Sequence, residues 1–254
     1  MSAYSCFARY YDALTANVGY ARRAAFFDSL VKKFGGKTDG ILLDLACGTG
    51  SLSEELARLG YDVIGTDISC EMLNIAMDKK AESGLAVQYL CQDMRRLDMF
   101  GTVDVTVCAL DSLNHLHSFD DVKRVFGRVS LFTPRDGLFL FDVNTIHKHR
   151  DILGCNNFVY ETDEVYCVWE NTYTEEKHRV GILLNFFENT EKNNYVRSSE
   201  EFSELAYPLE DIAAALTECG FEICGIFDED TENEGSEASE RVTFAAKKIK
   251  SANE

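Results

Sequence analysis

The 254-residue sequence lacks long hydrophobic runs and has few basic residues for its number of acids. No apolar stretch approaches the roughly 18 residues that a membrane-spanning helix needs, so we expect no membrane partner. Its 25 lysines and arginines face 43 acids, which gives a net charge of −18. A nucleic-acid substrate requires a basic surface that neutralises phosphates, and no basic stripe is present. The charge balance therefore disfavours a polynucleotide partner.

Metal-binding and disulfide patterns are also missing. None of the nine cysteines forms a Cys-x-x-Cys pair, their number is odd, and most lie in apolar surroundings. Reduced, buried thiols are therefore expected rather than a disulfide framework or a zinc site. The segment 1–14 lacks the basic head and apolar run of a signal peptide. We expect a cytoplasmic protein without a bound metal, and the sequence leaves open whether it is a monomer or a homodimer.

The stretch Ile41–Gly50 (ILLDLACGTG) is the most informative part of the sequence. It predicts a buried strand that runs into a glycine turn and then into a helix from about Ser51. Gly48 and Gly50 can adopt positive φ, and the free amides of the helix start favour an anionic ligand. The next predicted strand ends at Asp67, about 20 residues later, where a carboxylate meets ribose hydroxyls in βαβ nucleotide sites. An adenosine-containing cofactor is therefore predicted at the carboxyl ends of parallel strands.

Strand and helix patterns alternate along the first part of the chain. Near-continuous apolar runs are typical of a parallel sheet that is covered on both faces, and the alternation predicts a doubly wound α/β fold. The predicted strands are 41–45, 61–66, 87–91, 103–109 and 138–143, and the predicted helices between them are 51–59, 70–82 and 119–131. A helix after Pro208 and two further strands, 221–227 and 241–247, complete the expected core.

Two motifs carry a resemblance to a known family. Asp44-Leu-Ala-Cys-Gly48-Thr-Gly50, followed by Asp67-Ile-Ser-x-x-Met72, resembles the class I S-adenosylmethionine (SAM)-dependent methyltransferases. Ala46 stands where that family usually has the first of three alternate glycines. The resemblance implies a seven-stranded, mostly parallel Rossmann-like sheet that an antiparallel hairpin closes, with SAM as cofactor and S-adenosylhomocysteine (SAH) as product. A dinucleotide fingerprint would place its third glycine at Ser53, which weakens an NAD-linked dehydrogenase as an alternative.

The resemblance also implies roles for individual residues. Asp67 would hold the ribose hydroxyls and Asp93 the adenine amino group, and the methionine end would lie on the backbone of 46–48. The complete set of expected cofactor-binding residues is Asp44, Ala46, Cys47, Gly48, Gly50, Asp67, Ile68, Met72, Asp93, Met94 and Leu110.

Methyl transfer is an in-line displacement with a good leaving group, so proximity and alignment supply much of the rate. A base is needed only if the acceptor still carries a proton. The polar groups expected nearest the methyl are Asp111, Asn114, His115 and Asn144, together with Tyr11 from an N-terminal aromatic segment that resembles the family's lid. Of these, His115, Asn144 and Tyr11 are the catalytic candidates. A magnesium site built from Asp111, Asp142 and Asn144 is disfavoured, because the magnesium-dependent catechol-type family usually has an adjacent Asp-Asn pair, whereas Val143 separates Asp142 from Asn144 here.

Residues 155–206 differ from the rest of the chain. Three segments rich in β-branched and aromatic residues, 165–173, 180–187 and 195–202, predict an antiparallel meander inserted after the fifth strand. We therefore expect residues 1–154 and 207–254 to form the SAM-binding core, and 155–206 to cover the substrate site. Such an insertion resembles those of sugar-amine N-methyltransferases, although a structural flap or a dimer surface is the alternative.

The expected reaction is methyl transfer to N or O of a small-molecule acceptor. The only prolines, Pro134 and Pro208, form no Asn-Pro-Pro-Tyr run after the fourth strand and no Pro-Cys pair, which disfavours methylation of adenine, glutamine amides or cytosine C5. A tRNA or protein methyltransferase is one alternative, and a non-catalytic SAM-binding module is another. The sequence does not identify the acceptor.

Overall fold

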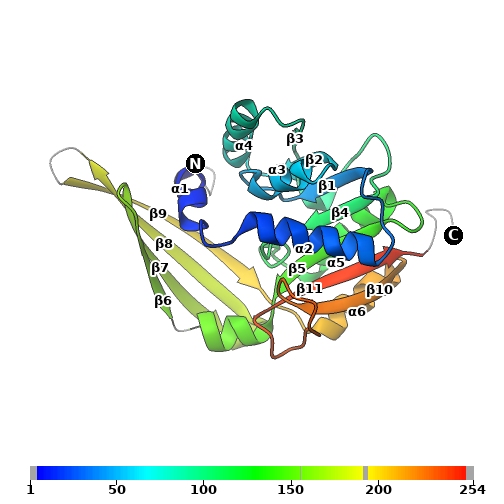
Figure 1. The fold of residues 1–254 in the computed structure, drawn as a ribbon. Helices are drawn as coiled ribbons and strands as arrows, with labels where there is room; N and C mark the ends of the chain where they lie inside the picture. The colour runs from blue at the N-terminus through cyan, green and yellow to red at the C-terminus, as the bar shows by residue number, and fades with distance from the viewer. Residues whose placement is uncertain (1–4, 155, 191–193, 250–254) are drawn as a thin grey trace.

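The computed structural model describes residues 5–154, 156–190 and 194–249, and its main element is a seven-stranded sheet (Figure 1). The strand order is β10-β11-β5-β4-β1-β2-β3. All neighbouring pairs from β5 to β3 are parallel, whereas β11 is antiparallel to both β5 and β10. The strands are β1 (Ile41–Leu45), β2 (Asp62–Asp67), β3 (Gln88–Cys91), β4 (Val105–Cys108), β5 (Leu138–Asn144), β10 (Phe221–Asp228) and β11 (Arg241–Lys248). The predicted doubly wound fold is confirmed.

Helices cover both faces of this sheet because successive residues of each strand point to opposite sides. Leu42 packs with α2 (Tyr20–Lys33) and α3 (Ser51–Arg58). Its neighbour Leu43 packs on the other face with α5 (Phe119–Phe132) and α6 (Leu209–Glu218). The remaining core helix, α4 (Cys70–Ser83), begins after Ser69, whose hydroxyl caps it by accepting the Met72 amide. These buried faces fix the strand ends at which the site lies.

A second, four-stranded antiparallel sheet projects from one side of the core (Figure 1). It follows β5 through a π-helical segment, Lys148–Leu153, that the sequence did not predict. Its strands are β6 (Asn157–Glu161), β7 (Val165–Thr174), β8 (Arg179–Thr190) and β9 (Asn194–Leu205), with a 3₁₀ turn at Glu175–Lys177. The predicted insertion is thus present with one strand more than expected. The short edge strand β6 was missed because it adds only five residues.

The N-terminal helix α1 (Ser5–Leu14) lies between this second sheet and α4 (Figure 1). Tyr10 is buried against an apolar face of the second sheet that includes Phe186, and Phe7 packs beside it. Phe7 also donates its backbone N–H to Glu200 on β9. The helix is therefore anchored on the insertion and borders the carboxyl ends of the core strands. Within the described residues, no helix is both long and apolar enough to cross a membrane.

Candidate functional site

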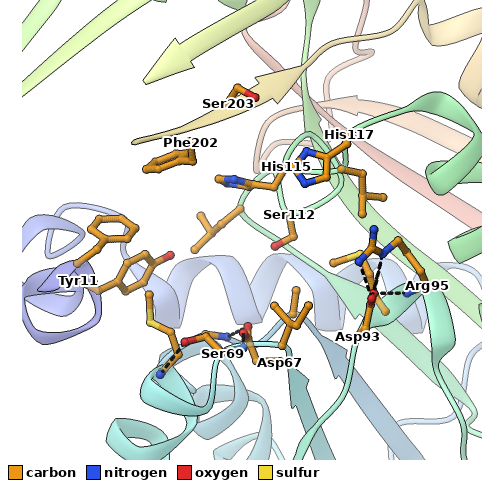
Figure 2. A pocket seen from close by; sticks show the side chains of 18 of the residues that line it. Tyr11, Asp67, Ser69, Asp93, Arg95, Ser112, His115, His117, Phe202 and Ser203 are labelled. Carbon is orange, nitrogen blue, oxygen red and sulfur yellow. Dashed lines mark hydrogen bonds and ion pairs between the residues drawn. The ribbon is translucent and has the colours of Figure 1, made fainter. Parts of the chain in front are cut away.

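A cavity of about 610 Å³ lies between the carboxyl ends of the parallel strands, helix α1 and strand β9. Figure 2 shows Asp67 and Ser69 on one side of it, Asp93 with Arg95 on another, and His115, His117 and Phe202 opposite. A smaller pocket of about 40 Å³ adjoins it beside the glycine turn. Five residues line both cavities: Tyr11, Ala46, Gly48, Leu110 and Ser112.

The glycine turn after β1 has the backbone that its sequence predicts. Gly48 and Gly50 have φ of +54° and +75°. A side chain at Gly50 would collide with the Tyr89 hydroxyl, whereas the space beside Gly48 is open to the cavity. Ala46 also has a positive φ, +63°, which costs an L-residue about 1–2 kcal/mol. The alanine that replaces the family's usual glycine therefore stores strain at the cavity wall.

Asp67 lies at the end of β2 and faces the cavity. Its Oδ2 accepts the Gly48 amide at 2.8 Å and its Oδ1 accepts the Ser69 amide at 2.8 Å. Burial raises the pKa of Asp67, and these backbone hydrogen bonds oppose that rise. The carboxylate thus ties the glycine turn to the start of α4 and keeps lone pairs for a ligand.

The opposite rim is formed by the chain after β3. Asp93 caps the 3₁₀ turn Met94–Arg96 and pairs with Arg95, whose Nη2 lies 2.6 Å from Oδ2. The hydrogen bonds from Arg95 lower the pKa of Asp93. Ile68 is 60% exposed on the facing rim, and Met94 also lines the cavity.

Asp44 lies below the turn and is fully buried. It lines the smaller pocket together with Cys47, and its carboxylate accepts the hydroxyl of Ser53. Burial raises the pKa of Asp44 to about 7. Of the eleven predicted cofactor residues, Asp44, Cys47 and Gly50 do not line the larger cavity, and Gly50 lines neither cavity.

The loop after β4 has two residues in the left-handed region, Leu110 (φ +58°) and Asp111 (φ +53°). Their amides both donate to Asp142, at 2.9 and 2.6 Å. Asp142 also accepts the Arg23 guanidinium at 2.7 Å, and both side chains are buried. Asp142 was weighed as a magnesium ligand from its position at the end of the fifth core strand, but here its oxygens hold the loop that places Leu110.

The far end of the cavity is polar and partly aromatic. The His115 and Phe202 rings have centroids 5.3 Å apart, and His115 Nε2 lies 3.8 Å from Glu204 Oε1. Glu204 is buried, and its Oε2 faces His149 Nε2 at 3.3 Å and accepts the Asn144 amide at 3.1 Å. Burial alone would raise the pKa of Glu204, but the hydrogen bond from His149 and the histidine charges outweigh it and lower the pKa.

Asn144 was expected near the transferred methyl, but the structure buries it beneath the cavity lining. Its amide nitrogen donates to both Asp111 and Glu204 and so links the β4 loop to the insertion. His115 and Tyr11 do line the cavity (Figure 2). Burial raises the pKa of Tyr11 well above its usual value, so its phenol remains a hydrogen-bond donor at neutral pH.

One group of potential metal ligands occurs among the described residues. Asp111, His115 and Glu204 bring one ligand atom each to within 4.8 Å of one another. Both oxygens of Asp111 are already engaged, Oδ1 by Arg241 at 2.7 Å and Oδ2 by Asn144 at 2.8 Å. A cation would lie beside the Arg241 guanidinium, so the geometry favours a hydrogen-bond network over a metal centre.

Several lining residues were not predicted as site residues from the sequence. They come from α1, the start of α4, the segments after β3 and β4, and the second sheet, and they are Phe7, Ser69, Gln92, Arg95, Ser112, Leu116, His117, Arg179, Glu201, Phe202 and Ser203. The buried Glu204 beneath them was also missed. The only sequence signal for Glu204 was its position as a single acid at the end of a predicted strand, and such acids are too common to identify a site.

Comparisons with known proteins agree with this geometry. The family model described as "Methyltransferase domain" matches residues 42–137. A protein of Geobacillus sp. strain WCH70 named "putative methyltransferase" is 33% identical over 245 residues, which covers 96% of this chain and 99% of that protein. A SAM-dependent methyltransferase structure from Clostridium acetobutylicum ATCC 824 has a TM-score of 0.87 and 33% identity, covering 97% and 99% of the two chains. A sugar N-methyltransferase from Streptoalloteichus sp. ATCC 53650 has a TM-score of 0.78 at 19% identity, covering 94% and 93%, which shows a shared fold.

Proposed function

Because the chain belongs to the class I SAM-dependent methyltransferase family, we propose that it transfers the methyl of SAM to N or O of a small molecule. The observation that carries this proposal is the junction of the two cavities. One cavity extends toward Asp67 and Asp93, and the other lies on the glycine turn. An extended cofactor with its adenosine in the first and its methionine part in the second has its sulfonium at their junction.

At that junction the methyl group points toward the end of the cavity that His115 and Phe202 border. Asp67 binds the ribose hydroxyls with its remaining lone pairs, and Ile68 and Met94 flank the adenine. Asp93 is paired with Arg95, so its carboxylate binds the Arg95 guanidinium and the adenine amino group at the same time. Tyr11 closes the junction from the lid and donates its phenol hydrogen toward the acceptor.

The acceptor occupies the space between the core and the second sheet. That space is of small-molecule size, since the whole cavity of about 610 Å³ must hold the cofactor's adenosine as well. His115 is the group placed to receive a proton, and Glu204 beside it stabilises the imidazolium that would form. An amine that has already lost its proton needs only alignment.

Parallel calorimetric titrations with SAM, SAH and NAD test the cofactor assignment. Micromolar affinity for SAM and SAH, with none for NAD, is expected. A panel of amines and alcohols is then screened for SAH formation with the full chain. Binding of NAD alone would overturn the proposal, and SAM binding without turnover of any small acceptor would favour a macromolecular acceptor or a binding module.

A further inference from the structure

Two cysteines lie in contact at the rim of the cofactor cavity. The Sγ atoms of Cys70 and Cys91 are 2.8 Å apart, and both side chains are exposed to solvent. Cys70 is the first residue of α4 and Cys91 is the last residue of β3. Neither residue has a part in the binding or methyl transfer described above.

The backbone holds these two sulfurs together. Asp67 and Cys91 are paired in the parallel register of β2 and β3, and the Gln92 amide donates to the Asp67 carbonyl at 2.9 Å. Cys91 Sγ also contacts the carbonyl oxygen of Ile68, at 3.6 Å. The sulfurs need to approach by only about 0.8 Å to reach the disulfide bond length of about 2.0 Å.

We propose that Cys70 and Cys91 form a thiol modification site that a low-molecular-weight disulfide oxidises to an intramolecular disulfide. The thiolate of one cysteine attacks the small disulfide, so that a mixed disulfide forms and one small thiol leaves. The thiolate of the other cysteine then attacks the protein sulfur of the mixed disulfide and displaces the second small thiol. The two cysteines lose two electrons and two protons, the protons pass to solvent and the displaced thiolates, and the oxidant becomes two thiols.

The surroundings of the pair set its reactivity. The hydrogen bond with Cys70 raises the pKa of Cys91 to about 11, with smaller contributions from partial burial and from nearby acids. Because the thiolate is the attacking species, the reaction accelerates as the pH rises. The bond is reversible with a thiol reductant, since exposed disulfides are the ones that exchange readily.

The disulfide joins the two segments that border the adenosine end of the cavity. One carries Asp67 and Ile68, and the other continues into Asp93 and Met94. A cross-link there removes motion that a bound cofactor would otherwise have to restrict, so the oxidised protein should bind SAH several-fold more tightly. This effect on SAH rests on the proposed function, whereas the disulfide itself does not.

The first test uses the reduced full-length protein, incubated with glutathione disulfide and then digested and analysed by mass spectrometry. We expect one peptide pair cross-linked between Cys70 and Cys91, which disappears on reduction and in Cys70→Ser and Cys91→Ser. Cys224→Ser, which alters a half-buried thiol on β10, is the control that should still form it. Both thiols remaining free, or stable mixed disulfides instead of the cross-link, would overturn the proposal.

The second test is titration of SAH into the reduced and the oxidised protein. A several-fold lower dissociation constant is expected for oxidised wild type, with no change on oxidation of Cys70→Ser. Equal affinities in the presence of the cross-link would overturn the coupling to the cofactor rim. If neither form binds SAH, the proposed function fails while the peptide map still decides the disulfide.

Discussion

Asp12 of helix α1 accepts a hydrogen bond from the hydroxyl of Thr49, in the glycine turn, at 2.6 Å. The same carboxylate accepts Ser51 at 3.1 Å and pairs with Lys79 of α4 at 2.8 Å. Helix α1 is therefore fastened to the turn on which the methionine part of the cofactor is proposed to lie. Because Tyr11 is the preceding residue, this contact also fixes the aromatic ring that borders the cavity junction.

Asp12→Ala should weaken this closure. The loss of charge-assisted hydrogen bonds should cost about 1–2 kcal/mol of SAH affinity, roughly a 5- to 30-fold rise in dissociation constant, through faster dissociation. Calorimetry measures the dissociation constant of SAH, and stopped-flow displacement measures its dissociation rate. Asp78→Ala, an exposed acid on α4, is the matched control, and equal behaviour of the two variants would contradict a latch at Asp12.

Ala46→Gly should stabilise the protein, unlike most Ala→Gly changes. The φ of +63° at Ala46 is strained for alanine and unstrained for glycine. Glycine gains entropy in the unfolded chain, so the net gain should be at most about 1 kcal/mol, or roughly 2–4 °C in Tm. Ala57→Gly, inside helix α3, should instead destabilise by about 1 kcal/mol. Thermal denaturation compares the Tm of the two variants with that of wild type. A similar fall in Tm in both variants would show that Ala46 is unstrained.

Asp44→Asn should change how stability depends on pH. Asp44 binds its proton more tightly in the folded state than in the unfolded chain, where its pKa is about 3.9. Its contribution to stability is therefore full below that value and is lost as the pH rises through the folded pKa of about 7.

Asparagine has no such titration, so the stability of Asp44→Asn relative to wild type should rise by about 1–2 kcal/mol between about pH 5.5 and pH 8. Urea unfolding of both proteins at each pH measures this change. Ser53→Ala removes the hydroxyl that bonds Asp44 and keeps the carboxylate, so it should retain the pH dependence. A constant difference between Asp44→Asn and wild type would contradict the raised pKa.

His115→Asn tests the proton acceptor once a turned-over acceptor is known. If His115 acts as a base, kcat should fall by about 10²-fold while SAH affinity stays within about twofold of wild type. Tyr11→Phe is the comparison, because the raised pKa of Tyr11 keeps its phenol protonated, so that it does not act as the base. An unchanged kcat in His115→Asn would point to alignment of an already neutral amine.

The part of the site that sequence predicts is the part that depends on local spacing. The glycine turn, Asp67 and the start of α4 lie within one βαβ unit, so their separation along the chain fixes their separation in space. Asp93 was placed in the same way, but its pairing with Arg95 was not predicted, because that ion pair depends on side-chain direction in a short 3₁₀ turn.

The rest depends on contacts between distant segments. Asp142 inside the apolar run of β5 was a visible anomaly, yet its partner Arg23 lies 119 residues earlier on α2. Glu204 meets Asn144 and the two histidines only because the second sheet returns to the core at Leu205, where Asn114 hydrogen-bonds the backbone. No spacing in the sequence encodes either contact, and one function of Asn144, holding two acids, became apparent only from the fold.

Asp67→Asn tests the ribose contact directly. The amide keeps the size of the side chain but loses the charge and half of the hydrogen-bond-accepting capacity. The binding of SAM and of SAH should therefore each weaken by about 1–3 kcal/mol. The Gly48 and Ser69 amides compete for the remaining oxygen, so the glycine turn should also loosen. Calorimetric titration measures the affinity, and thermal denaturation without ligand reports the second effect.

Asp93→Asn is the informative control for this prediction. The charge of Asp93 is already neutralised by Arg95. The replacement of Asp93 should therefore lower the affinity for SAH less than the replacement of Asp67 does. Adenosine alone should show the same ranking of the two variants, since both side chains lie at that end of the cavity. If Asp67→Asn binds SAH as wild type does, the ribose is held elsewhere; if Asp93→Asn is the weaker binder, the adenine contact dominates and Arg95 serves to orient its carboxylate.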